Sequence, residues 1–224
     1  SSDVCSSDLL GGDYKNIMND EMCHSVTNYE CYKGLHSSFN SMNLFEIIHS
    51  LLRQFGSEEW TLYKGKHLLS FVDNHDVTRV ASILENPEHL KLIYTLMYGM
   101  PGIPIIYYGS EWGFKAEKKD GDPALRPAFE EPLWNELTNH IAALSKAEKS
   151  SKAMQYGDFK SLLLTNRQCI FERECEDDRV LIAINAPDML GTLLALFVFS
   201  TLSKDSSCEK FDSWGISLPA LVLA

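Results

Sequence analysis

The chain has 224 residues, of which 45% are hydrophobic and 23% charged, a composition that excludes collagen-like, low-complexity and fully disordered proteins. Its length suits one large domain or two small ones. The 31 acidic and 20 basic residues give a formal net charge of −11, so we expect neither nucleic acid nor an anionic membrane surface as a partner.

The first residues lack the pattern of a folded element. Ser1-Ser2-Asp3 recurs as Ser6-Ser7-Asp8, without an apolar period and without the basic and apolar regions of a signal peptide. We therefore expect residues 1–10 to be a non-native leader, and we expect the chain to start in the middle of a longer gene.

Helical and strand patterns alternate between residues 39 and 109. Phe39–Phe55 has the apolar period of an amphipathic helix, and His67–Val72 is a short apolar strand. A second helix opens at Asn86-Pro87-Glu88 and ends at Gly99, and Gly102–Gly109 is a second apolar strand. Fully apolar strands that alternate with helices are typical of parallel strands covered on both faces, so we predict an α/β fold.

The pattern changes near Ser150-Ser151. After a last predicted helix over Leu133–Ala147, short strands with tight connections indicate antiparallel β structure: Phe159–Thr165, Gln168–Glu172, Arg179–Asn185 and Ile216–Leu223. The apolar run Met189–Phe199 lacks strand alternation and does not fit this pattern. It is too short to span a bilayer, and the longer run Leu90–Tyr108 is interrupted by Lys, Gly and Pro, so no membrane partner is expected.

Cysteine spacing argues against a metal centre. Six cysteines are scattered without a CxxC pair, so no spacing closes a short ligand loop. We expect free thiols in a reducing compartment and, with the acidic charge, a cytoplasmic location.

A run of polar residues follows the first predicted strand. Asp73, Asn74, His75 and Asp76 place a carboxylate, an amide and an imidazole where the active groups of parallel α/β folds lie. The alternative is a capping aspartate before a helix around Val80.

Several segments in register resemble the alpha-amylase family of glycoside hydrolases, and within it bacterial members of the cyclomaltodextrinase and neopullulanase type. The resemblance covers residues 11–185 and rests on these segments: Ser25–Tyr29 (sixth strand), Phe71–Asp76 (end of the seventh strand), Gly102–Glu111 (eighth strand), Asp122–Arg126 and Tyr156–Phe159. It implies that residues 11–150 form the C-terminal half of a (β/α)8 TIM barrel. Residues 151–224 would then form an antiparallel β-sandwich domain.

The resemblance also implies roles for four residues. Asp76 is expected as the third catalytic carboxylate, which grips sugar hydroxyls and helps distort the ring. His75 is expected to donate a hydrogen bond to the same sugar, and Asp122 and Arg126 to bind hydroxyls one sugar further away. Arg79 and Glu111 are expected as an ion pair or loop anchors, and Trp112 and Phe114 as a sugar-stacking platform or a loop anchor.

The family's nucleophile and general acid lie in Gly-x-Arg-x-Asp and Gly-Glu motifs, and neither motif occurs in this sequence. The expected parent is a retaining hydrolase of α-1,4-glucosidic bonds in starch-derived maltodextrins, with maltooligosaccharides as substrates. We expect this chain by itself to be inactive and poorly soluble. No cofactor or metal is expected in this segment, whereas calcium is expected, if at all, upstream. The alternatives are a transglycosylase or isomerase of the same family and a non-catalytic sugar-binding protein.

Overall fold

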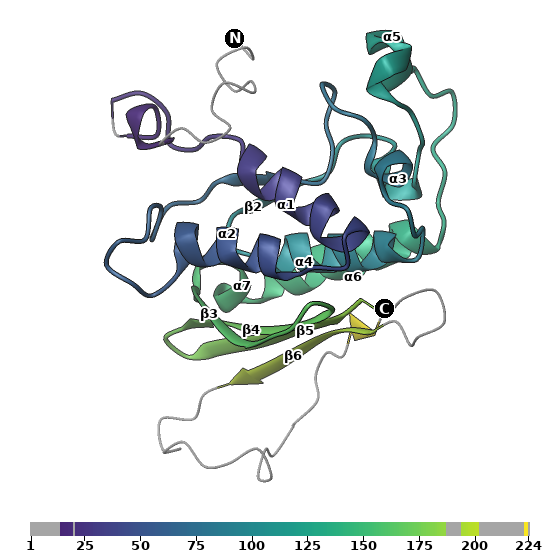
Figure 1. Cartoon of the computed structure of the whole chain (residues 1–224). Coiled ribbons are helices and arrows are strands. Elements are labelled where there is room, and N and C mark those ends of the chain that lie inside the picture. Colours follow the sequence, from purple (N-terminus) through teal and green to yellow (C-terminus); the bar gives the residue numbers. More distant parts are fainter. Residues whose placement is uncertain (1–13, 20, 187–193, 202–221, 224) are drawn as a thin grey trace.

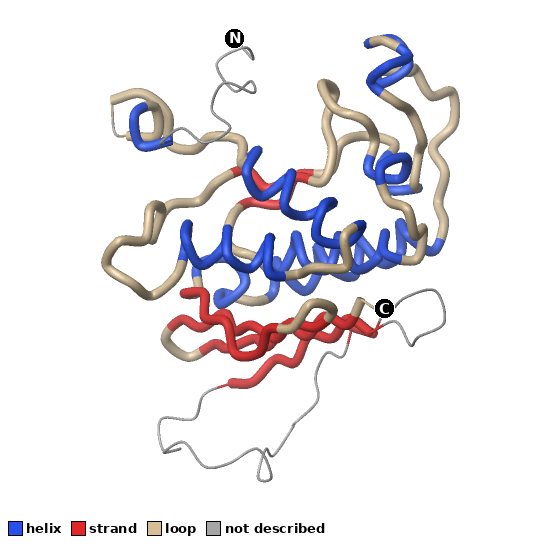
Figure 2. The backbone as a smooth tube through the Cα atoms, in the orientation of Figure 1, coloured by secondary structure: helices blue, strands red, loops and turns tan. Residues whose placement is uncertain are grey.

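The computed structural model describes residues 14–19, 21–186, 194–201 and 222–223. Figure 1 shows three layers, with two short parallel strands, a layer of helices and an antiparallel sheet. Figure 2 shows one layer of helices, which Figure 1 labels α2, α4 and α6, lying between the two sets of strands. None of the described helices is long and apolar enough to cross a membrane.

The parallel pair contains the strands that precede the candidate site. β1 (Leu69–Phe71) pairs in parallel with β2 (Ile103–Ile105), and α4 (His89–Gly99) lies between them in sequence. Parallel pairing of these two segments is therefore confirmed. Both strands are shorter than expected: β1 covers only part of His67–Val72, and β2 ends at Ile105, before Gly109. The expected strand Ser25–Tyr29 appears as a single bridge between Thr27 and Leu69.

The helices that cover this pair differ from the prediction at one place. α2 (Phe45–Phe55) begins six residues after the expected start, and α1 (Tyr29–Asn40) is a separate helix that was not predicted. A turn divides them, in which Met42 has a φ of 52°. Ser38 fixes this turn, because its carbonyl accepts from Asn43 N at 2.8 Å and its hydroxyl oxygen accepts from Ile47 N at 3.1 Å.

Five strands form the antiparallel sheet in the order β3-β4-β5-β6-β7. They are β3 (Asp158–Leu164), β4 (Gln168–Cys175), β5 (Asp178–Asn185), β6 (Leu194–Thr201) and β7 (Val222–Leu223). Most of the unassigned apolar run 189–199 therefore belongs to a strand, whereas only 222–223 of the last predicted strand lie within the described residues. Because the described residues form a single sheet here, the β-sandwich stays a prediction.

The sheet packs on the helical layer through a shared core. α6 (Glu136–Ser150) and α7 (Lys152–Tyr156) lead from the α/β part into β3. The buried side chain of Arg173 crosses this boundary, with Nη1 donating to Gly99 O and Nε to Gly157 O, both at 3.0 Å. Gly99 also lies against Phe171 and Ile182, and an added Cβ there would come within 3.0 Å of Ile182.

Three further short elements shape the loops near the site. α3 (Val80–Ile83) follows β1, whereas the 3₁₀ helices η4 (Ser110–Trp112) and η5 (Lys118–Asp120) and the helix α5 (Asp122–Leu125) follow β2. A 3₁₀ turn, η3 (Tyr14–Asn16), begins the described chain.

Candidate active site

The polar run after β1 is held in place by Asn74. Its Nδ2 donates to the Tyr29 hydroxyl at 3.0 Å, and its Oδ1 accepts from Asp76 N at 2.8 Å. Asn74 thus fixes the strand end against α1 and turns the backbone so that His75 and Asp76 follow as half-exposed side chains. This is the holding role that an amide at the end of a strand can fill.

The structure brings together the four side chains predicted for the site. Arg126 Nη2 lies 3.2 Å from Asp76 Oδ1, and His75 Nε2 lies 3.2 Å from Asp76 Oδ2. Arg126 Nη2 is also 3.9 Å from Asp122 Oδ2, and its Nε donates to His75 O at 3.4 Å. The side chains of Asp76 and Arg126 are each 43% exposed, so the cluster is open to a ligand.

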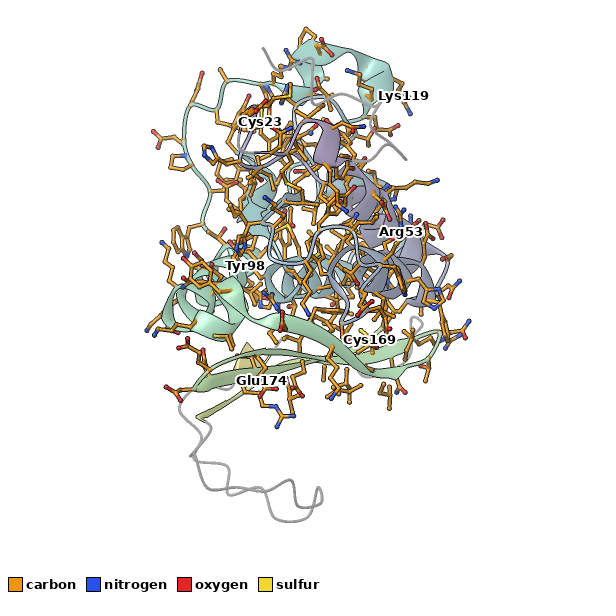
Figure 3. All side chains as sticks on the ribbon, turned by 90° about the vertical axis from the view of Figure 1, so that its left-hand side faces the viewer. Cys23, Arg53, Tyr98, Lys119, Cys169 and Glu174 are labelled. Atoms are coloured by element: carbon orange, nitrogen blue, oxygen red, sulfur yellow. The ribbon has the colours of Figure 1, made fainter. Side chains whose placement is uncertain are left out.

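Asp122 lies at the outer end of this cluster. It begins α5 and accepts from Lys118 Nζ at 2.9 Å, one helical turn earlier. The hydrogen bond and charge of Lys118, followed by the charge of Arg126, lower the pKa of the Asp122 carboxyl below its usual value. Asp122 therefore stays ionised and acts as a hydrogen-bond acceptor near neutral pH. In Figure 3, Lys119 marks this loop region at the end of the molecule away from Cys169 and Glu174 of the sheet.

A buried polar junction lies beneath the exposed cluster. Ser110 donates its hydroxyl hydrogen to Asp73 Oδ1 at 2.6 Å and accepts from Arg79 Nη1 at 2.9 Å. Asp73 Oδ2 also accepts from Val80 N at 2.8 Å, so the aspartate that caps the helix at Val80 is Asp73 and not Asp76. Burial raises the pKa of Asp73, while the Ser110 and Val80 hydrogen bonds oppose that rise.

Sequence reasoning missed the extent of this junction. It expected Arg79 to be structural, and the loop-anchor interpretation is confirmed, because Arg79 bonds to three separate points of the chain after β2. Asp73 was not named as a site residue. The signal for it was its place directly after a buried strand and seven residues before Val80, because a loop of that length can turn back so that the Asp73 carboxylate reaches the first N–H of the next helix.

Aromatic rings surround the cluster on one side. Tyr107 lies between the exposed cluster and the buried junction. Its ring centroid is 6.2 Å from the His75 ring and 4.1 Å from the Arg79 guanidinium carbon. Burial, followed by the neighbouring Tyr108, raises the pKa of Tyr107 to about 12, so its hydroxyl stays protonated. Trp112 and Phe114 each pack edge-on against Phe129 with centroids 5.0 Å apart, which favours the loop-anchor interpretation for both.

The chemistry that this arrangement allows is recognition of neutral polyols. Two carboxylates supply acceptors, and a guanidinium and an imidazole supply donors, all within one exposed cluster. Such alternation fits vicinal hydroxyl groups, which both donate and accept. Within the described residues, no group of three or more His, Cys, Asp or Glu side chains is arranged to hold a metal ion.

Comparison with known proteins identifies the family of the chain. A family model described as "Alpha amylase, catalytic domain" matches residues 15–168. A cyclomaltodextrinase from Thermoanaerobacter pseudethanolicus is 24% identical over 79% of this chain and 29% of its own length. An alpha-amylase from Niallia circulans is 29% identical over 55% of the chain and 23% of its own length.

Solved structures share the fold. A cyclomaltodextrin glucanotransferase with a three-domain ABC distribution superposes with a TM-score of 0.70 at 22% identity, over 85% of this chain and 38% of its own. The chain thus spans less than two-fifths of these three relatives. The match to the catalytic-domain model over 15–168, in the segment that holds the cluster, shows that this chain belongs to the alpha-amylase family.

Proposed function

We propose that this chain supplies the substrate-gripping part of a retaining glycoside hydrolase that cleaves α-1,4-glucosidic bonds of starch-derived maltodextrins. The observation that supports the proposal most is the single cluster of Asp76, His75, Arg126 and Asp122 beyond the carboxyl end of β1. Asp76 lies 3.2 Å from both His75 and Arg126, although these three residues are up to 51 positions apart in sequence.

In this proposal Asp76 binds hydroxyl groups of the sugar whose glycosidic bond is cut. Hydroxyl contacts that strengthen as the ring flattens toward the oxocarbenium-like transition state contribute several kcal/mol in glycosidases. His75 donates to the same sugar, while Asp122 and Arg126 bind the adjacent one. Arg126 contacts both Asp76 and Asp122, so it lies where the two sugars would adjoin.

The nucleophile and the general acid are proposed to come from polypeptide outside this chain. The sequence has no Gly-x-Arg-x-Asp and no Gly-Glu motif, and without both carboxylates a retaining mechanism cannot proceed. By itself the chain is therefore expected to be inactive. Poor solubility is also expected, because Ile103 and Ile105 of β2 are 47% and 37% exposed.

A second candidate is glucan transfer, in which a sugar hydroxyl takes the place of water. Its support is the similarity to glucanotransferases, including one from Niallia circulans that is 26% identical over 52% of the chain. A non-catalytic sugar-binding protein is the third candidate. Product analysis after incubation with maltoheptaose separates them: shorter linear sugars indicate hydrolysis, longer or cyclic ones indicate transfer, and no product with retained binding indicates the binding protein.

The test of the proposal uses the polypeptide encoded by the complete source reading frame and the variant Asp76→Asn. We expect kcat for maltoheptaose to fall at least 100-fold, since several kcal/mol of transition-state contact correspond to that range. Asp120→Asn is the matched control, because Asp120 is an exposed aspartate two residues before Asp122 and takes part in none of the contacts that form the cluster. Activity of Asp76→Asn within tenfold of the unsubstituted enzyme would refute the role of Asp76.

A further inference from the structure

Arg79 connects the two loops that form the candidate site. Its Nη1 donates to Tyr108 O at 2.9 Å as well as to Ser110 Oγ, and its Nη2 donates to Leu125 O at 2.7 Å. Its own backbone N–H donates to Ala116 O at 3.0 Å. One fully buried residue therefore joins the loop after β1 to four points of the segment after β2, three through its side chain and one through its backbone.

The contact with Leu125 determines where Arg126 lies. Leu125 is buried and Arg126 is the next residue, so the carbonyl held by Arg79 fixes the backbone from which the Arg126 side chain reaches Asp76. On its other side the Arg79 guanidinium covers the Tyr107 ring, which in turn faces His75. Arg79 thus contacts a neighbour of each half of the cluster without being exposed to a ligand itself.

Only arginine suits this position. A planar guanidinium directs several N–H groups at once toward acceptors in different directions, whereas a lysine ammonium is a single point that cannot reach all of them. Ser110 completes the arrangement, because its hydroxyl donates a hydrogen bond to Asp73 and accepts one from Arg79. The buried charge of Arg79 is thereby linked to a carboxylate through one hydroxyl.

We propose that Arg79 is the positioning residue for glucan binding at this site: through the Leu125 carbonyl it holds Arg126 in register with Asp76. The inference rests on the proposed function of the cluster. It predicts that Arg79 affects substrate binding through Arg126, so that the effects of changing both residues are not independent.

A double-mutant cycle on the polypeptide of the complete reading frame tests this inference. Arg79→Lys and Arg126→Gln are each expected to lower kcat/KM for maltoheptaose about tenfold, mainly through a higher KM. In the double variant the loss should stay within twofold of the Arg126→Gln variant alone, because Arg126 is then no longer there to be positioned. Lys115→Gln, an exposed side chain of the same loop, is the control and should change kcat/KM less than twofold.

The outcomes separate the inference from the proposed function. If the two losses multiply to about 100-fold, or if Arg79→Lys leaves KM unchanged, the positioning role is wrong while the hydrolase remains. If the unsubstituted polypeptide neither binds nor cleaves maltoheptaose, the proposed function fails and the inference fails with it. If circular dichroism shows that Arg79→Lys does not fold, Ser110→Ala takes its place. A loss of kcat/KM of about threefold for Ser110→Ala alone, with no further loss in the Arg126→Gln background, supports the inference. Any other pattern overturns it.

Discussion

The close approach of Gly102 to the neighbouring strand gives a prediction with a magnitude. Gly102 has a φ of +131° and precedes β2, and a Cβ added there would lie 2.5 Å from Ser70 Oγ and 2.7 Å from Leu68 O. The Ser70 hydroxyl can rotate away. The Leu68 carbonyl cannot, because it is backbone and accepts from Ile103 N at 2.8 Å, which joins the two parallel strands.

We expect Gly102→Ala to lower the free energy of unfolding by about 2–4 kcal/mol. The strained φ accounts for about 1–3 kcal/mol, and weakening of the bond between the strands adds about 1 kcal/mol. Urea unfolding followed by circular dichroism measures the change, provided that the slope of the transition stays constant.

Gly65 provides the matched control for this measurement. It also has a positive φ, of +74°, but an added Cβ there would meet nothing within 4 Å. Gly65→Ala should therefore show only the strain of a left-handed residue, about 1–2 kcal/mol. Equal losses for the two variants would refute the reasoning, because they would mean that the approach of Leu68 has no energetic effect.

Three other outcomes are expected. Burial lowers the pKa of three histidines, His36, His67 and His140, below 6.5, so the unfolded chain takes up more protons than the folded one in mild acid. The unfolding midpoint should therefore be constant above pH 6.5 and decrease below it, and the decrease should be less steep in His140→Gln. A midpoint that does not change with pH would contradict this prediction. Iodoacetamide should label exposed Cys23 long before Cys31, whose burial raises its thiol pKa, as peptide mass spectrometry will show; equal labelling would count against the fold. Arg173→Met removes the donor from the buried carbonyls of Gly99 and Gly157 and should lower the free energy of unfolding by about 2 kcal/mol or more. The control Lys160→Met, at an exposed position, should change it by less than about 0.5 kcal/mol. Similar values for the two variants would contradict the role of Arg173.

The sequence allowed the site cluster to be located because the relevant signals are local. A buried strand followed at once by Asn74, His75 and Asp76 needs only the rule that active groups follow parallel strands. Asp122 and Arg126 were added by family resemblance. Their spacing of four residues lets them meet across one helical turn: Asp122 begins α5 and Arg126 directly follows its last residue.

The elements that were missed depend on more distant information. α1 begins at Tyr29 with a cap from Asn28, but its polar residues hide the apolar period, and Met42 seemed to continue the period of α2 although it lies in the turn between them. β6 was missed because a continuously apolar run shows no alternation. The contacts of Arg79 span 29 to 46 residues, and no local pattern reports which carbonyls a buried arginine will reach.

Burial divides the site into two parts that differ in what they contribute. The Asp76–Arg126 pair is 43% exposed on both sides, and such pairs contribute about 0–1 kcal/mol to stability, so they do not account for the fold. Arg79 and Asp73 beneath them are almost completely buried and are hydrogen-bonded to the two loops. A binding site requires exposed side chains that are held in place by buried contacts, even though the exposed contacts add little stability. An ordinary solvated surface has no need of such buried contacts. Asp76→Asn should accordingly leave the melting temperature within about 3 °C while kcat falls, and a parallel loss of both would mean that the cluster serves the fold instead.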